Sequence, residues 1–279
     1  MEGMRQVTAT NAGPLTGAGT NTYIIGTRDV AILDPGPDDP AHLAAILAAL
    51  PAGATVSAIL VSHAHRDHSA LAGALARAVS APVLAHGFRP AEALDGLGGG
   101  EGLDKSFRPD RLLSDGAVIS GAGWRLEAVH TPGHLSDHLC FAWAARGAIF
   151  TGDHVMGWAS TVVSPPDGDM EAYLASLDRL AARGERRYLP AHGDAIADGP
   201  ARGAALRAHR LSREAAILDA LAAGPADLAT LTARVYRDTP PALYPAASRN
   251  LLAHLIKLGR AGSIASDGAP PLAAVFHRP

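Results

Sequence analysis

The segment His63–His68 constrains the fold and the chemistry of this chain more than any other feature. It reads HAHRDH, so four side chains of metal-binding type fall within six residues. The apolar run Ile59–Val61, typical of a buried strand, ends just before it. Chemistry in α/β folds lies at the carboxyl ends of strands, and divalent ions such as zinc prefer imidazole and carboxylate ligands. The segment therefore predicts a metal site at a strand end.

Three later segments repeat this local design, in which a strand is followed by a small residue and then by a ligand. VHTPGH carries His134, IFTGDH carries Asp153 and YLPAHG carries His192. A single pair of histidines could simply lie on a polar loop. The recurrence of the design at four strand ends instead favours one shared metal site.

Composition excludes several other classes of protein. The single cysteine, Cys140, rules out a disulfide framework within the chain and a cysteine-based zinc finger. It lies in an apolar run, where we expect a buried thiol. A hydrophobic content of 48% is enough for a real core. The apolar runs are far shorter than the ~20 residues that cross a bilayer, and no secretory signal precedes them. We therefore expect a cytoplasmic protein without a membrane partner.

The first two thirds of the chain alternate strand-like and helical patterns. This mixture of hairpins and βα units predicts a mixed sheet with helices on its outer faces. Gly96–Gly100 is expected to form a flexible loop. The expected strands include residues 22–25, 30–33, 57–61, 82–85 and 148–150, and the expected helices are 40–50, 69–79 and 170–183.

The pattern changes near residue 200. Helices are expected over 201–222, 226–236 and 246–258, followed by a glycine-containing turn and apolar strands. This is the order of a winged-helix module, although many plain helical caps share it. Charge changes at the same point. Residues 1–199 have 14 basic and 22 acidic side chains, net −8, and residues 200–279 have 10 and 5, net +5. We expect two domains, 1–200 and 201–279.

Basic side chains of the second domain leave two interpretations open. They could steer a polyanion such as RNA, or they could be solvated arginines on a helical cap. Few aromatic residues accompany them, so the stacking platform of single-strand binders is not apparent. The residues concerned are Arg207, Arg210, Arg213, Arg249, Lys257 and Arg260.

The motif order HxHxDH, TPGH, GD and PAHG resembles the metallo-β-lactamase superfamily over about residues 15–195. The resemblance implies a four-layer αβ/βα sandwich and a hydrolase with two zinc ions per chain. These ions would share a hydroxide that acts as the nucleophile, oriented by Asp67 as the catalytic residue. The resemblance assigns His63, His65 and His134 to one metal, Asp67, His68 and His192 to the other, and Asp153 to a position bridging both.

Details of the motifs exclude some branches of this superfamily. His65 stands where diiron, flavin-partnered relatives have glutamate, and no cysteine lies near the motifs, as a Cys-ligated β-lactamase would require. Antibiotic hydrolysis is therefore not expected. The stretches GAGTNTY, GHLSDH and GDHVMGW are similar to a lactamase-beta-2-like subgroup with an appended winged-helix-like domain. The animal member of that subgroup is an endoribonuclease acting on single-stranded RNA, and bacterial members are often simply called hydrolases.

The leading expectation is thus a dinuclear metal-dependent hydrolase, with single-stranded RNA favoured as substrate. The main alternative is a glyoxalase II-like thioesterase or acyl-ester hydrolase, because the same ligand set serves both chemistries. A nucleic-acid-binding regulator with a ligand-sensing hydrolase-like body is a third interpretation, and a mononuclear iron oxygenase is a fourth. The substrate-binding residues, the leaving-group acid and the oligomeric state stay unassigned.

Several residues near the motifs have both a structural and a functional interpretation. His130, His138 and His154 are expected to be structural, with His154 the best candidate for orienting a ligand. Trp158 and Tyr173 are expected in the core rather than in the substrate cleft. Asn21 and Arg66 are divided evenly between a role toward substrate and a purely structural or solvent-facing one.

Overall fold

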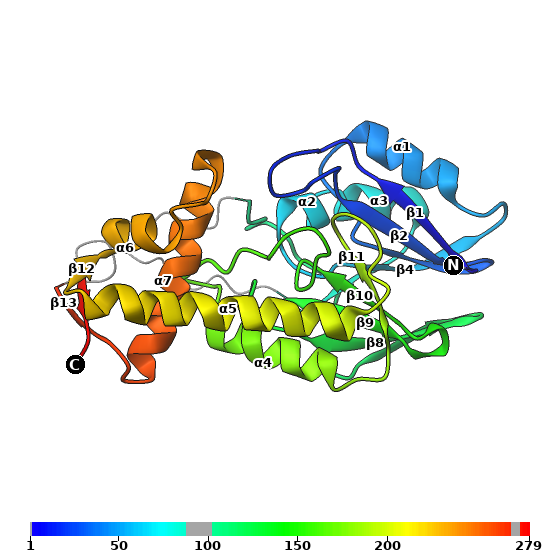
Figure 1. The fold of residues 1–279 in the computed structure, drawn as a ribbon. Helices are drawn as coiled ribbons and strands as arrows, with labels where there is room; N and C mark the ends of the chain where they lie inside the picture. Colours follow the sequence, from blue (N-terminus) through cyan, green and yellow to red (C-terminus); the bar gives the residue numbers. More distant parts are fainter. Residues whose placement is uncertain (1, 88–101, 269–273) are drawn as a thin grey trace.

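A computed structural model describes residues 2–87, 102–268 and 274–279, and the expected loop Gly96–Gly100 lies outside them. Two mixed β-sheets face each other in its first two thirds, with strand orders β1-β2-β3-β4-β5-β6 and β11-β10-β9-β8-β7 (Figure 1). The strands are β1 (Met4–Thr8), β2 (Asn21–Gly26), β3 (Asp29–Leu33), β4 (Thr55–Leu60), β5 (Val83–Ala85), β6 (Arg111–Leu112), β7 (Val118–Gly121), β8 (Trp124–His130), β9 (Leu139–Trp143), β10 (Ala148–Gly152) and β11 (Arg187–Pro190).

Helices cover the outer face of each sheet. The first sheet carries α1 (Pro40–Ala49), α2 (Arg66–Ser69) and α3 (Ala72–Val79), and the second carries α4 (Met170–Ala181) and α5 (Gly199–Ala222). Alternate residues of a strand point to opposite faces. Ile24 and Ile32 accordingly pack outward toward the helices, whereas Ile25 and Leu33 pack inward toward the second sheet. The predicted four-layer αβ/βα sandwich is confirmed.

Aspartates begin most of the longer helices. The side chains of Asp39, Asp169 and Asp198 accept a backbone N–H in the first turn of α1, α4 and α5, and Asp227 does the same for α6 (Leu228–Val235). Such caps satisfy amide groups that have no partner within the helix. One expected helix differs, because residues 69–79 are divided between α2 and α3.

The end of the chain forms three helices and a small sheet. α5, α6 and α7 (Tyr244–Arg260) pack on a three-stranded sheet ordered β12-β14-β13, comprising β12 (Ala226–Asp227), β14 (Val275–His277) and β13 (Ala265–Asp267). The β-structure distinguishes a winged helix from a plain helical cap. α6 begins two residues later than expected because residues 226–227 pair with β14. Two short 3-10 helices, η1 (Ala144–Arg146) and η2 (Pro241–Leu243), complete the elements of the described residues.

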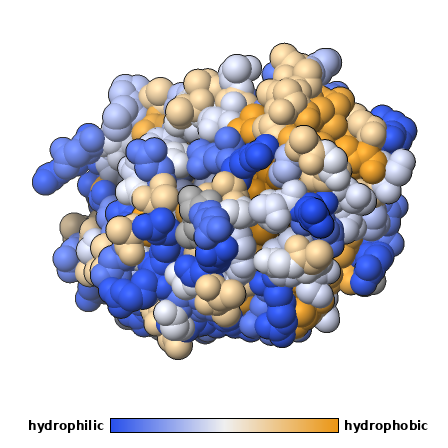
Figure 2. All heavy atoms as spheres, turned by 90° about the vertical axis from the view of Figure 1, so that its right-hand side faces the viewer, coloured by the Kyte–Doolittle hydropathy of each residue, from blue (hydrophilic) through white to orange (hydrophobic). Residues whose placement is uncertain are grey.

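α5 links the two parts, since it lies on α4 and continues into the winged helix (Figure 1). Figure 2 shows the opposite end of the molecule, where apolar side chains gather in its upper part, at the height of α1. α1 carries no Asp, Glu, Lys or Arg, and Leu47 on it is exposed. Among the described residues, no helix combines the length and apolar character needed to span a membrane.

Candidate functional site

Loops at one edge of the sandwich bring the seven predicted ligands together. Each loop follows a strand: β4 leads to the HAHRDH segment, β8 to TPGH, and β10 and β11 to the GD and PAHG motifs. The ligand atoms of each of two groups lie within 4.8 Å of one another. One group is His63, His65, His134 and Asp153, and the other is Asp67, His68 and His192.

In the first group, three imidazole rings converge on one point. His65 Nδ1 lies 2.9 Å from His63 Nε2 and 3.0 Å from His134 Nε2. Two neutral imidazole rings can form a hydrogen bond in which one ring nitrogen donates its proton to the other. When three ring nitrogens point at one another, they have more lone pairs than protons to pair with them. The arrangement fits a cation at the centre.

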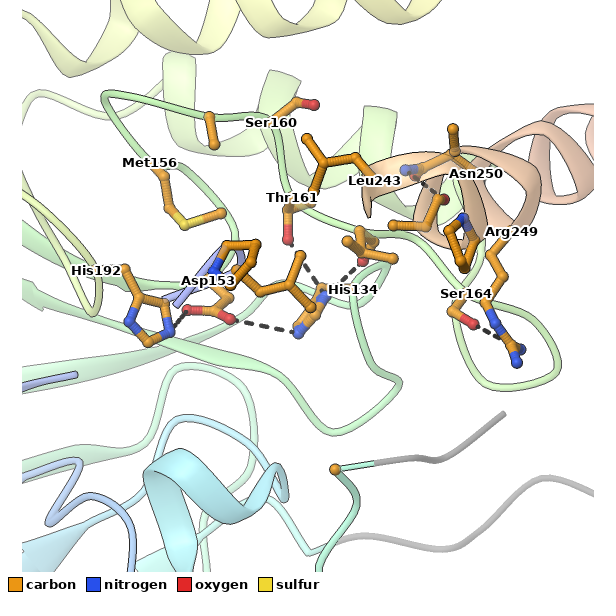
Figure 3. Close-up of a pocket in the computed structure, with 18 of the residues that line it drawn as sticks. His134, Asp153, Met156, Ser160, Thr161, Ser164, His192, Leu243, Arg249 and Asn250 are labelled. Atoms are coloured by element: carbon orange, nitrogen blue, oxygen red, sulfur yellow. Dashed lines mark hydrogen bonds and ion pairs between the residues drawn. The ribbon is translucent and has the colours of Figure 1, made fainter. Parts of the chain in front are cut away.

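The second group meets the first at Asp153. Asp153 Oδ1 lies 3.3 Å from His192 Nε2, and its Oδ2 lies 3.7 Å from His134 Nε2 (Figure 3). The same Oδ1 lies 3.5 Å from His68 Nε2. Asp67 Oδ2 lies 3.3 Å from His192 Nε2. The two oxygens of one carboxylate thus face the two groups, as a bridging ligand requires.

Orphaned polar atoms test whether the site fits metal. His68 Nε2 and Asp153 Oδ1 are buried and have no hydrogen-bond partner. Buried polar atoms are nearly always paired, so two such atoms facing each other indicate that another species completes the site. Oxygen and nitrogen donors of this kind suit zinc and related divalent ions.

The pKa values of the ligand side chains show the effects of burial and of neighbouring charges. Burial, reinforced by His134, lowers the pKa of His65 to about 3, which leaves a neutral ring able to bind metal. Burial acts against the charge of Asp67, but His68 and His192 outweigh it and lower that pKa to about 2. Burial also opposes protonation of His192, yet Asp153 raises its pKa to about 10. Without a cation, the carboxylates therefore hold protons on neighbouring rings.

Partners behind the ligands orient the rings. His68 Nδ1 lies 3.2 Å from Asp34 Oδ2, and the same carboxylate accepts bonds from the backbone and hydroxyl of Ser62. His192 Nδ1 donates to Gly19 O at 3.1 Å. Such partners select the tautomer that leaves the other nitrogen free for metal. Asp34 was missed from the sequence, although a carboxylate directly after the apolar run of β3 is the signal used for the other ligands.

Among the flanking histidines, His138 rather than His154 contacts a ligand. His138 Nε2 accepts from the backbone N–H of Asp153 at 3.2 Å, and its Nδ1 is 2.9 Å from the Thr131 hydroxyl. His154 is buried against Tyr173, and neither of its ring nitrogens has a hydrogen-bond partner. His154 thus has the structural role expected for it, and His138 is a better candidate than His154 for orienting a ligand.

For four other residues the sequence left two interpretations, and the structure favours one for each. Asn21 is buried in β2 and donates to the carbonyl oxygens of Pro190 and Gly193, so it holds β2 against the end of β11. Tyr173 lies in the core, as expected. Trp158 does not, since it is 47% exposed and lines the cavity described next. Arg66 is exposed and directs its Nε toward Leu103 O.

A cavity of about 1030 Å³ opens beside the cluster. Asp67, His134, Asp153 and His192 form part of its wall, and residues of η2 and α7 face them from the winged-helix side (Figure 3). Most of the remaining wall is apolar, with side chains from both parts of the chain: Pro14, Leu15, Met156, Trp158, Leu243 and Pro245.

Comparisons with known proteins agree with this geometry. An atrochrysone carboxyl ACP thioesterase of Aspergillus chevalieri is 34% identical over 220 residues, 77% of this chain and 65% of that protein. The thioesterase pkgB of Emericella nidulans is 33% identical over 215 residues, 76% of this chain and 57% of that one. This chain thus spans less than two thirds of the length of these relatives.

A solved structure covers the whole chain. The metallo-beta-lactamase family protein from Thermus thermophilus has a TM-score of 0.80 at 25% identity, covering 100% of this chain and 99% of its own. Residues 228–270 match the family described as Beta-lactamase associated winged helix domain. Residues 15–192 match the Metallo-beta-lactamase superfamily. The chain therefore belongs to the metallo-β-lactamase superfamily.

Proposed function

We propose that this protein hydrolyses acyl thioesters at a centre of two zinc ions. One observation carries the proposal: the cluster of seven ligand-type side chains opens directly into a large cavity with mostly apolar walls. The thioesterase names of two relatives support it. The other hydrolytic substrate expected from the sequence is single-stranded RNA, which would need a positively charged surface. Lys105, Arg213 and Arg249 lie in the cavity wall, but apolar side chains outnumber them there.

The ligand cluster would supply the chemistry of hydrolysis. Two zinc ions held by His63, His65, His134, Asp67, His68, His192 and bridging Asp153 would activate water and polarise the acyl oxygen. Asp67 keeps 29% of its side chain exposed, against 12% for Asp153, and it lines the cavity. Its carboxylate is therefore placed to hold the proton of the attacking water. A thiol has a pKa of about 8.5, so a thiolate can leave without a dedicated acid.

The size and lining of the cavity indicate which kind of acyl group it would bind. Its volume of about 1030 Å³ reaches the upper end of the range of ~300–1,000 Å³ found for small-molecule pockets. Leu15 and Trp158 from the sandwich and Leu243 from η2 all line this space. Apolar walls bind by burial rather than by charge. We infer that the acyl group is bulky and apolar.

Ion pairs of three of the six basic residues argue against a role in binding RNA. Arg207 pairs with Asp178 at 2.8 Å and Arg260 with Asp169 at 2.6 Å, so both connect the winged-helix side to α4. Lys257 pairs with Glu214 at 2.9 Å. Two of these ion pairs, Arg207–Asp178 and Arg260–Asp169, therefore join the basic second part of the chain to the acidic first part, whereas Lys257–Glu214 lies within the second part. The same contacts weaken the case for a nucleic-acid-binding regulator.

A substrate panel tests the proposal. The zinc-loaded protein would be assayed with acetyl and octanoyl thioesters of N-acetylcysteamine, a single-stranded RNA and a simple phosphodiester. We expect release of free thiol, faster with octanoyl than with acetyl, and loss of this activity in Asp67→Ala. Metal analysis should find two zinc ions per chain, and a single iron would favour the oxygenase interpretation. RNA cleavage lost in Asp67→Ala, without thioester turnover, would overturn the proposal.

A further inference from the structure

The loop that follows β10 carries the partner of one predicted ligand. His134 Nδ1 donates to the carbonyl oxygen of Val162 at 2.6 Å, with the Thr161 hydroxyl at 3.2 Å from the same nitrogen (Figure 3). An imidazole with its proton on Nδ1 has its lone pair on Nε2, the atom that faces His65. The position of the Val162 carbonyl therefore determines which way the ring of His134 points.

Two residues of the winged-helix side hold this loop on either side of Val162. Arg210 of α5 donates through Nη2 to Thr161 O. Asn250 of α7 accepts the backbone N–H of Val163 through Oδ1 at 2.9 Å. Arg210 Nη1 also lies 3.3 Å from Asn250 Oδ1, so the two side chains act as one unit. The loop can shift only if these bonds break.

Burial makes the contact rigid. Arg210 is 1% exposed, and the Asn250 side chain is fixed further by a bond from Nδ2 to Ala246 O. The Arg210 guanidinium also stacks over the Tyr173 ring at 5.5 Å. A buried guanidinium is costly unless its donors are paired, so its orientation toward the loop is a specific feature. The backbone of Tyr173 packs against Gly133, immediately before His134.

We propose that Arg210 and Asn250 are positioning residues that hold residues 161–163 so that the Val162 carbonyl orients His134 toward its metal. The winged-helix side thus helps to build the metal centre, besides forming a wall of the cavity. The proposal rests on the metal-binding part of the proposed function, but not on the identity of the substrate.

Zinc affinity of the metal-free full-length protein tests this role. Competition with a fluorescent zinc chelator would resolve the two sites in the wild type and in Asn250→Ala. Partners behind metal ligands are worth about 10- to 100-fold in affinity. We expect one site to weaken by about that factor while the other keeps its affinity. Asn250→Asp retains an acceptor for Val163 and Arg210, so it should bind both ions nearly as well as the wild type.

Two further variants separate positioning from general stability. Arg207→Ala removes the exposed ion pair with Asp178, which also joins the two parts but does not touch the loop. It should leave both zinc affinities unchanged. Arg210→Lys keeps the positive charge but loses the planar guanidinium group with its several donors. This variant tests the proposal if Asn250→Ala fails to fold. It should weaken the same single site.

The outcomes distinguish the two proposals. Wild-type affinities at both sites in Asn250→Ala and Arg210→Lys would overturn the positioning role while leaving the proposed function intact. An equal loss in Arg207→Ala would also overturn it, because the effect would then be general. Failure of the wild type to bind zinc would instead overturn the proposed function.

Discussion

Replacing the buried carboxyl of Asp137 by an amide should stabilise the protein at alkaline pH more than at acidic pH. Asp137 lies between His134 and His138 and is 1% exposed. Burial, and then the nearby carboxylate of Asp167, raise its pKa from 3.8 to about 7. Asp137→Asn retains the size of the side chain and removes the charge.

The size of the effect follows from proton linkage. Below pH 3.8 the carboxyl is protonated in the folded and unfolded states, so it costs nothing. Between pH 3.8 and about 7 only the unfolded state loses the proton, so the free energy of unfolding falls as pH rises. At about 1.4 kcal/mol per pH unit the full penalty is ~4 kcal/mol, of which about 2 kcal/mol arises between pH 5.5 and 8.

Urea unfolding of the metal-free wild type and of Asp137→Asn at pH 5.5 and pH 8 measures this penalty. The difference in free energy of unfolding between variant and wild type should grow by about 2 kcal/mol toward pH 8. Titrating groups that do not interact with Asp137 cancel in that difference. A difference that is the same at both pH values would refute the reasoning, since Asp137 would then be ionised throughout.

Three further predictions concern the site. Asp34→Asn should weaken one zinc site about 10- to 100-fold, whereas the exposed Asp38→Asn should not; equal affinities in a zinc titration would contradict this. Zinc binding at pH 6.5 should release at least two protons, from His68 and His192, whose pKa values are raised; a pH-stat that records none would exclude those protonated rings. Trp158→Ala should raise KM about 10-fold or more for octanoyl thioester and much less for acetyl thioester, and steady-state assays showing equal changes would place the acyl group elsewhere.

The clustering of the candidate ligands could be predicted in part because its signal is local, and the division into two metal sites came from the family resemblance. Four candidate ligands follow an apolar strand by one to four residues, so strand ends and ligand identity together marked His63, His134, Asp153 and His192. The winged helix was predictable for a similar reason, since helix periods and breakers are read within short windows. The sandwich itself came from the resemblance carried by these motifs.

Partners across long sequence separations could not be read in this way. Asp34 lies 34 residues before His68, and Arg210 lies 49 residues after Thr161. The net charge of a segment is the same whether its arginines face solvent, RNA or a carbonyl oxygen. The buried position of Arg210 could therefore not be predicted from the sequence. Trp158 lies in a loop, where no periodicity indicates which side is exposed.

Metal titration of thioester hydrolysis tests the central claim most directly. Metal-free protein would receive zinc in steps while the release of thiol from octanoyl thioester is followed. The two groups joined by Asp153 predict activity that reaches its plateau at two zinc ions per chain and is lost on chelation. Thioester turnover that persists without metal, or a complete absence of turnover at full zinc occupancy, would contradict the account.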